Sequence, residues 1–325
     1  MNKNIKIFLN YFLGPLLFIA LSWSLYKQII NRPDLPERWE QIKLSWKNGY
    51  FWIAFFLVFL NWGLEARKWQ LLIAPLEKFT FIKAFKSVLS GCSVTMLTPN
   101  RIGEYGGRIV YVQEEHRLSA IPLTILGSIS QLSVTVIVGT LGLLFFRFGN
   151  GNPALFDLMP AIAADILIGA CVIASISLVL IYLRVGLIIK MVSKIKRLHK
   201  LNRYLELLSS FSRKQLLRIL FLSFLRYMVF ILQYVLLLKV MQVDIANVLC
   251  FWLLSVFYLL MAIAPTIGFT ELPVRAAVSV QVLQLYSSNI IGIQAASLVI
   301  WIINLVIPAI AGSLLIFGIK IMKEK

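Results

Sequence analysis

Two short polar stretches, far apart in an otherwise apolar sequence, carry residues suited to binding a charged ligand. The first, 97–108, reads Leu-Thr-Pro-Asn-Arg-Ile-Gly-Glu-Tyr-Gly-Gly-Arg, and the second, 264–275, reads Ala-Pro-Thr-Ile-Gly-Phe-Thr-Glu-Leu-Pro-Val-Arg. Each has a proline, a glycine, a glutamate and an arginine in the same order: Pro99, Gly103, Glu104 and Arg108, then Pro265, Gly268, Glu271 and Arg275. The arginine follows its glutamate by about one helical turn, so the two side chains can pair.

Arginine suits a phosphate group because its guanidinium presents a fork of hydrogen-bond donors. We therefore expect Arg101, Arg108 and Arg275 to contact an anionic ligand. Glu104 and Glu271 would hold the arginines when the site is empty, or exchange protons. The alternative is that each Glu–Arg pair is a structural staple that caps its own hairpin. Ionisable residues inside a membrane are costly unless paired. Their presence in both stretches therefore needs an explanation, either ligand binding or a structural staple.

A few polar residues within the apolar runs are further candidates. Arg226 lies in the middle of a run, where it either contacts the ligand or a hairpin glutamate, or simply snorkels or pairs. Gln131 and Gln233 are expected to form hydrogen bonds between helices. Glu65 and Arg67 are interpreted as an interfacial pair at the end of an apolar run.

The prolines and glycines of the two stretches predict where helices break. We expect Pro99 and Pro265 to end the helices before them. The neighbouring glycines are expected to allow close backbone approach more than ligand contact: Gly103, Gly106, Gly107 and Gly268.

Composition places the chain among polytopic membrane proteins. It has 325 residues, of which 59% are hydrophobic and 14% charged, with a net charge of +18. The basic residues cluster in short stretches between apolar runs, and cytoplasmic loops of membrane proteins are enriched in Lys and Arg in this way. The positive charge therefore does not indicate a nucleic-acid partner. Cys92, Cys171 and Cys250 are widely spaced within apolar segments, so we expect neither a disulfide nor a metal site.

An all-α membrane fold follows from the lengths of the apolar runs, because a spanning helix needs about 20 residues. Six runs qualify as spans: Tyr11–Ile30, Tyr50–Trp69, Ile121–Phe146, Pro160–Leu183, Leu216–Leu238 and Ala295–Gly318. Two pairs of shorter runs flank the polar stretches and predict re-entrant hairpins: Ala84–Thr98 with Glu104–His116, and Val248–Ala264 with Pro273–Tyr286. The basic segment Arg184–Arg218 is either an amphipathic helix on an anionic leaflet or a solvated connector.

Charge distribution sets the orientation of this topology. With both hairpins re-entrant, the most basic segment and both termini lie in the cytoplasm. The two hairpins then enter from opposite sides and form an inverted repeat, whose helix breaks meet near the midplane. We predict a single domain over residues 1–325, with a first half at about 1–183, a connector at 184–215 and a second half at about 216–325.

The first polar motif resembles the lysylphosphatidylglycerol synthase transmembrane-region family. The resemblance rests on Thr98–Glu104 followed by Gly107 and Arg108, and on Ala264–Gly268 with Glu271 and Arg275. It implies a flippase-like membrane domain that translocates aminoacylated phosphatidylglycerol. Because the sequence stops at Lys325, we expect no synthase domain. Asn100 stands where the family usually has glycine, and asparagine tolerates a left-handed backbone. The turn can therefore form, although the lipid need not be the same.

Three functions remain open on this reading. The first is a translocase of an anionic or aminoacylated phospholipid, or of a lipid-linked intermediate, in the cell membrane. The second is a non-catalytic partner of a separate lipid-modifying or cell-envelope enzyme. The third is a membrane-embedded transferase. No nucleophile elbow, zinc-protease motif or phosphate-binding loop occurs in the sequence. This weakens the enzyme interpretation without closing it, since a membrane-embedded transferase can use lone carboxylates. We expect no enzyme and no cofactor.

Overall fold

The computed structural model describes residues 35–96, 98, 102–149, 153–157, 160–194, 202, 204–264 and 271–323, with the single positions 23, 26, 27 and 30. Within these ranges the chain is helical and contains no strand, which confirms the predicted all-α class. The first predicted span, Tyr11–Ile30, falls almost wholly outside the described residues. So do Pro99, Asn100, Arg101, Pro265 and Gly268.

The helices divide at the basic connector. Before it come α3 (Leu35–Leu44), η2 (Ser45–Lys47), α4 (Gly49–Ile73), α5 (Phe81–Thr95), α6 (Gly103–Ile109), η3 (Glu114–His116), α7 (Arg117–Phe148), η4 (Pro153–Phe156) and α8 (Ala161–Leu183). The connector contains α9 (Val185–Val192) and η6 (Glu206–Ser210). After it come α11 (Arg213–Val240), α12 (Asn247–Ile263), α13 (Glu271–Leu283), α14 (Ile290–Trp301), the π-helical turn η8 (Ile302–Val306) and α15 (Ile307–Lys323).

Five of these segments are long and apolar enough to cross a membrane: Gly49–Ile73, Glu114–Phe148, Ala161–Leu183, Arg213–Val240 and Ile290–Phe317. Each contains most or all of one of the predicted spans, so the chain is a multi-pass membrane protein. The helices around the two polar stretches are shorter, as the sequence indicated. The segment Arg184–Arg218, for which an amphipathic helix was one of two alternatives, is not one continuous helix, because α9 ends at Val192 and η6 is a separate short turn packed against α9.

Local sequence fixes where several helices begin. The Asn48 side chain accepts a hydrogen bond from the backbone N–H of Tyr50, at 2.9 Å, and caps α4. Thr80 caps α5 in the same way. Ser212 and Gln215 form a reciprocal capping box at the start of α11. These caps satisfy N–H groups that have no partner within the helix, so the long helices start at defined residues.

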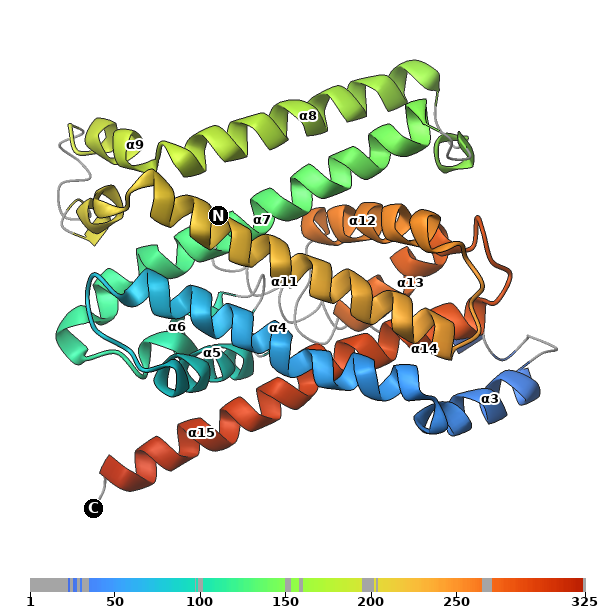
Figure 1. The fold of residues 1–325 in the computed structure, drawn as a ribbon, viewed down its shortest axis with the longest axis horizontal. Helices are drawn as coiled ribbons and strands as arrows, with labels where there is room; N and C mark the ends of the chain where they lie inside the picture. Colours follow the sequence, from blue (N-terminus) through green and yellow to red (C-terminus); the bar gives the residue numbers. More distant parts are fainter. Residues whose placement is uncertain are drawn as a thin grey trace, which may run out of the picture.

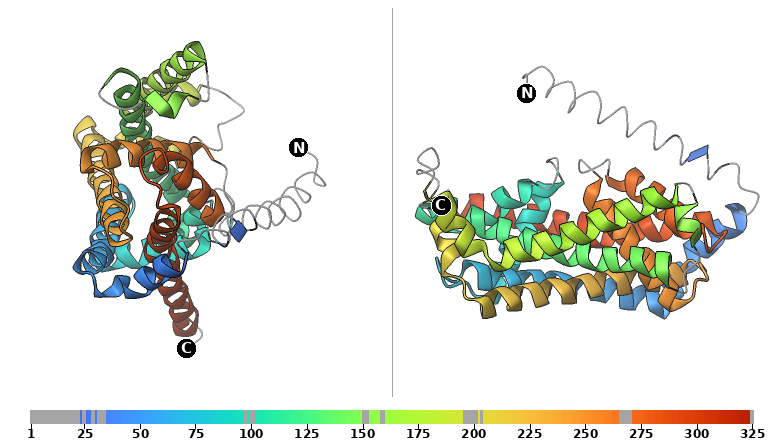
Figure 2. Two further views of the ribbon diagram at one scale, coloured as in Figure 1. Left: turned by 90° about the vertical axis from the view of Figure 1, so that its right-hand side faces the viewer. Right: turned by 90° about the horizontal axis from the view of Figure 1, so that it is seen from above.

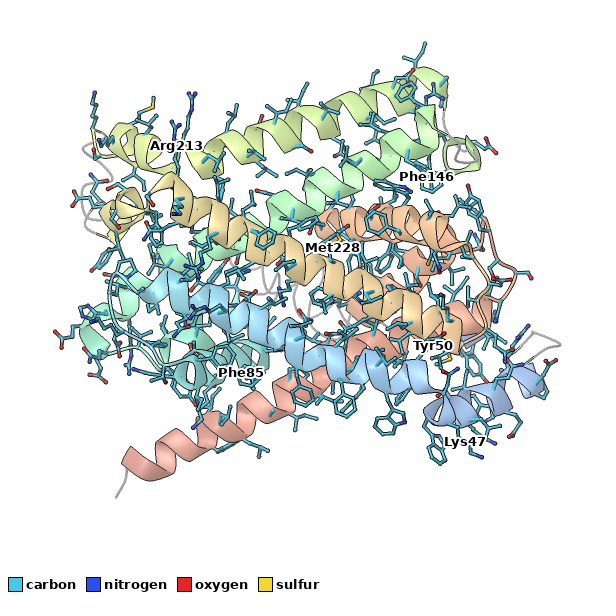
Figure 3. The ribbon with its side chains drawn as sticks, viewed as in Figure 1. Lys47, Tyr50, Phe85, Phe146, Arg213 and Met228 are labelled. Atoms are coloured by element: carbon cyan, nitrogen blue, oxygen red, sulfur yellow. The ribbon has the colours of Figure 1, made fainter. Side chains whose placement is uncertain are left out.

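The long helices run along the longest axis of the molecule, and the short ones lie near its two ends (Figure 1). Helices α5 and α6 lie toward the end where α11 begins, and α12 and α13 toward the end where α4 begins (Figure 1). Arg213 labels the first of these ends, and Lys47 and Tyr50 label the second (Figure 3). Helix α8 packs along α7 at one side of the bundle (Figure 2). The two helical pairs therefore lie toward opposite ends of the bundle (Figure 1).

The packing of the two halves is reciprocal. Helix α4 packs against α11, α5 packs against α15, and α12 packs against α7. Glycines allow α7 to approach α12 closely and α15 to approach α5 closely. A Cβ on Gly139 of α7 would come within 2.5 Å of the Leu259 side chain, and one on Gly312 of α15 would overlap the backbone of Leu89. The first helix of each short pair thus packs against the long helix that follows the short pair of the other half.

Candidate functional site

The predicted polar residues that the structure describes fall at the inward ends of the two hairpins and on α11. Glu104 and Arg108 lie on α6, and Glu271 and Arg275 lie on α13. Arg226 lies in the middle of α11. The prediction for Arg101 lies outside the described residues, as do those for the helix-breaking Pro99, Pro265 and Gly268.

The first hairpin holds its arginine in a space made by glycine. Arg108 is only 2% exposed and forms an ion pair with Glu104, one turn earlier on α6. A Cβ on Gly91 of α5 would lie 2.9 Å from the Arg108 side chain, so the absence of a side chain there makes room for it. Trp69 of α4 donates to the hydroxyl of Ser87, which donates to the Arg108 carbonyl, at 2.9 and 2.8 Å. These bonds tie the hairpin to α4.

The glycines of the first hairpin differ in their surroundings. A Cβ on Gly107 would lie 2.7 Å from the Ser90 carbonyl carbon, and one on Gly103 would lie 2.6 Å from that of Val94. The expectation of close backbone approach is therefore confirmed for these two. For Gly106 it is wrong, because a Cβ there would meet nothing within 4 Å.

This difference gives a matched pair of substitutions. We expect Gly107→Ala to separate α5 from α6 and to lower the melting temperature of the purified protein in detergent, at a cost of about 1–3 kcal/mol. Gly106→Ala, at the next residue, adds the same methyl group in open space and should leave the melting temperature unchanged or slightly higher. Equal melting temperatures for the two variants would contradict this packing.

Glu65 of α4 is the centre of the charged cluster, and the predicted interfacial pair with Arg67 is wrong. Glu65 is 4% exposed. Its Oε1 lies 2.7 Å from Arg108 Nη2, and its Oε2 lies 2.7 Å from Lys68 Nζ and 3.2 Å from Arg226 Nη1. Arg67 is exposed and donates to Gln70. One carboxylate thus contacts three cations that come from α4, α6 and α11.

Arg226 connects this cluster to the rest of the bundle. Its Nη1 donates to Gln131 Oε1 on α7, at 3.4 Å, and its guanidinium carbon lies 5.4 and 5.0 Å from the ring centroids of Trp62 and Phe230. Gln131 also donates to the Ser223 carbonyl on α11, which confirms its expected role between helices. Arg226, which belongs to the second half, therefore pairs with an acid and an amide group of the first half and does not merely snorkel.

The second hairpin repeats the pairing of the first. Arg275 Nη2 lies 2.8 Å from Glu271 Oε1, one turn earlier on α13. The guanidinium carbon of Arg275 lies 5.7 Å from the ring centroid of Phe257 on α12. Both predicted Glu–Arg pairs thus form, as expected both for a structural staple and for a ligand site that is empty.

Two cavities lie beside the described Glu–Arg pairs. One, of about 200 Å³, is lined by Glu271, Arg275 and Arg226 among others. The other, of about 290 Å³, is lined by Glu65, Lys68, Glu104 and Arg226 among others. The cavities share the side chains of Trp62, Gln131, Thr135, Arg226 and Ala262. The described ends of the two hairpins therefore border adjoining spaces, with Arg226 in the wall of both.

Polar contacts also join the two halves of the chain. Asn61 of α4 donates to Asn304 of η8, at 2.7 Å, in a buried contact. Asn304 sits within the π-helical turn that interrupts α14 and α15, a feature often found at functional sites. Gln233 of α11 donates to the Ala54 carbonyl, at 2.9 Å, which confirms its expected role. Within the described part of the chain, no group of three or more metal-ligating side chains comes together.

Sequence reasoning missed Glu65 and Lys68 as site residues. The spacing of these two residues, three apart, allows them to pair on one helix face but does not show that the pair is buried. The partners Arg108 and Arg226 lie on other helices and only the fold brings them together.

A family model described as the lysylphosphatidylglycerol synthase TM region matches residues 11–312. The matched range contains both hairpins and every charged residue described above. No match was found among curated proteins. None was found among solved structures.

Proposed function

This chain belongs to the lysylphosphatidylglycerol synthase transmembrane-region family, and we propose that it translocates a phospholipid between leaflets. The substrate would have an anionic or aminoacylated headgroup, or be a lipid-linked intermediate. The observation that carries the proposal is a buried cluster of paired charges on the wall of two adjoining cavities. Charges buried inside a membrane protein mark substrate pathways when they line a cavity.

The headgroup would bind beside Arg226, which among the described charged side chains is the one that lines both cavities. Arginine offers two parallel hydrogen bonds to a phosphate. We propose Arg101, Arg108, Arg275, Glu104 and Glu271 as the surrounding site residues. The ion pairs with glutamate would compensate the charge of the arginines when no lipid is bound.

The arrangement of the hairpins supports an inverted repeat with two re-entrant hairpins. The α5–α6 pair and the α12–α13 pair lie toward opposite ends of the bundle (Figure 1). Reciprocal packing of α5 on α15 and of α12 on α7 is what a two-fold axis in the membrane plane would produce. In transporters of this kind the site lies at the repeat interface, and one repeat moves against the other.

Charge supports an orientation with the α11 start in the cytoplasm. The end where α5 and α11 begin carries a set of basic residues that includes Lys78, Lys83, Lys86, Arg117, Arg184, Arg213, Lys214 and Arg218. Cytoplasmic loops have such an excess of Lys and Arg. We propose cytoplasmic termini and a location in the cell membrane.

The proposal involves no covalent chemistry on the lipid. The basic surface around α9 favours a second, non-catalytic function, which is docking of a separate lipid-modifying enzyme. A translocase and a docking protein differ in one measurement, since only the first moves lipid when it is reconstituted alone.

The test is lipid movement in liposomes that contain the purified full chain. A fluorescent phosphatidylglycerol is added, and the probe in the outer leaflet is quenched with dithionite. We expect Arg226→Gln to slow movement by at least about tenfold, because a charged hydrogen bond contributes more than the ~1.4 kcal/mol that a tenfold change represents.

The matched control is Arg147→Gln. Arg147 also pairs with a carboxylate, Asp165, at 2.8 Å, but it lines neither of the two cavities. It should move lipid at the wild-type rate. Equal rates for Arg226→Gln, Arg147→Gln and wild type would refute the proposed site, and the absence of movement in the wild type would refute the translocase.

A further inference from the structure

Three neutral hydrogen-bond donors line the cavity beside Arg275. This cavity, of about 200 Å³, is bordered by Trp62 of α4, Tyr227 of α11 and Trp301 of α14. In the part of the chain that the structure describes, the two indole N–H groups and the Tyr227 hydroxyl are buried and have no hydrogen-bond partner. Trp62 and Tyr227 are only 5% and 2% exposed. Three helices, from both halves of the chain, thus bring donors that the protein leaves unused to one space.

The chemistry of this wall fits a ligand with oxygen atoms better than one with an ammonium group. Buried donors are unfavourable without an acceptor, and an indole N–H can only donate. An ammonium group also only donates, so it cannot serve them. A cationic headgroup often binds over aromatic faces, but the Arg226 guanidinium already lies over the rings of Trp62 and Phe230. Glu271, the carboxylate among the described lining residues, pairs with Arg275.

The phosphate of a lipid does not need these neutral donors. Arg226 and Arg275 line the same cavity, and one guanidinium can donate two parallel hydrogen bonds to the two free oxygens of a phosphodiester. The neutral donors then remain for oxygen atoms farther along the headgroup. One water takes about 30 Å³ of the liquid, so the cavity has room for a group of several atoms.

We infer that this cavity binds the hydroxyl groups of a polyol or sugar headgroup, with Trp62, Tyr227 and Trp301 as the donors. The inference rests on the translocase function proposed above and narrows its substrate class. Hydroxyl oxygens accept hydrogen bonds from neutral donors, and a tyrosine hydroxyl can also accept one in return. A headgroup of the same charge without hydroxyl groups leaves the three donors without a ligand partner, so it should be moved more slowly.

The experiment compares two fluorescent lipids of equal charge in liposomes that contain the full chain. Phosphatidylinositol carries a ring of hydroxyl groups on its phosphodiester, and phosphatidylethanol carries only an ethyl group. The label is on an acyl chain of both lipids, and dithionite quenches the probe in the outer leaflet. Wild type should move phosphatidylinositol faster. Because phosphatidylinositol has the larger headgroup, a limit on size alone would give the opposite preference.

Tyr227→Phe removes one donor and keeps the ring. The ratio of the phosphatidylinositol rate to the phosphatidylethanol rate should fall about three- to tenfold, the range for one neutral hydrogen bond. Trp301→Phe removes a second donor and should lower the ratio in the same direction, and the double variant should lower it further. Since the Tyr227 hydroxyl has no partner in the described chain, its loss should not lower the melting temperature.

The matched control is Tyr234→Phe. Tyr234 is also a buried tyrosine of α11, but it lines neither of the two cavities. This variant should keep the wild-type ratio of rates. A ratio that fell equally in Tyr234→Phe and Tyr227→Phe would show that the change does not report on the cavity, and it would overturn the inference.

Other outcomes also overturn the inference while movement of phosphatidylglycerol leaves the translocase standing. One is a wild-type rate for phosphatidylinositol no higher than that for phosphatidylethanol. Another is equal slowing of both lipids in Tyr227→Phe, which would assign the hydroxyl to the phosphate, and a third is an unchanged ratio, which would assign it to water. If Tyr227→Phe is not recovered in folded form, Trp301→Phe decides by the same criteria. A wild type that moves none of the three lipids refutes the translocase as well.

Discussion

Glu65→Gln is expected to lower the free energy of unfolding by about 3–5 kcal/mol, the usual cost of removing one partner from a buried ion pair. The substitution keeps the shape of the side chain but leaves Lys68, Arg108 and Arg226 without the carboxylate that all three contact. The measurement is the melting temperature of the purified chain in detergent, together with its yield in folded form. Lipid movement by the recovered protein should fall as well.

Glu40→Gln is the matched control for this loss. Glu40 also pairs with a lysine, Lys43, at 2.7 Å, but the Glu40 side chain is 65% exposed. Exposed pairs contribute only about 0–1 kcal/mol, so its melting temperature should barely change. Adding Lys68→Met to Glu65→Gln removes one stranded cation and should recover part of the lost stability. Equal effects of Glu65→Gln and Glu40→Gln would show that Glu65 is not a buried hub.

The long helices were predictable because hydropathy and length determine them locally. Residues 50–69 and 121–146 were recognised as spans, and the structure extends them to α4 and α7. The short hairpin helices were predictable for the same reason, since 15 residues at 1.5 Å each reach only about 22 Å. The number of spans and the re-entrant path stay predictions.

The burial of Glu65 was not predicted, because the end of its helix was placed too early in the chain. The predicted span ended at Trp69, which put Glu65 near the end of its helix. In the structure α4 continues to Ile73, and Trp69 is fully buried, with its indole N–H donating to Ser87. An aromatic residue near the end of an apolar run is therefore ambiguous, because a tryptophan can anchor in the interface or pack against a neighbouring helix.

The partners of the cluster were beyond the reach of sequence for a different reason. Glu104 with Arg108 and Glu271 with Arg275 are neighbours on a helix, so spacing predicted both pairs. The contact of Glu65 with Arg108 joins α4 to α6, with α5 between them in the sequence. No local sequence pattern predicts this contact. The sequence thus predicted the pairs within α6 and within α13, whereas the contacts of Glu65 with other helices depend on how the helices pack.

Gly312→Ala is expected to be the most disruptive single-methyl substitution in the packing between the halves. A Cβ at this position of α15 would overlap the Leu89 carbonyl oxygen and lie 2.5 Å from its carbon. These are backbone atoms of α5 and cannot rotate away, so α15 and α5 must separate. We expect a loss of about 3 kcal/mol, the upper end for overpacking. Since α6 is packed on α5, the hairpin that holds Arg108 would move as well.

Gly169→Ala separates this effect from the general effect of replacing a helical glycine. Gly169 lies in α8, and a Cβ there would meet nothing within 4 Å. Alanine favours a helix over glycine by about 1 kcal/mol, so this variant should melt at the same or a higher temperature than wild type. Gly312→Ala should melt lower and move lipid more slowly. If both variants melted alike, α5 and α15 would not cross as closely as the structure requires, and the reciprocal packing behind the inverted repeat would lose one of its two contacts.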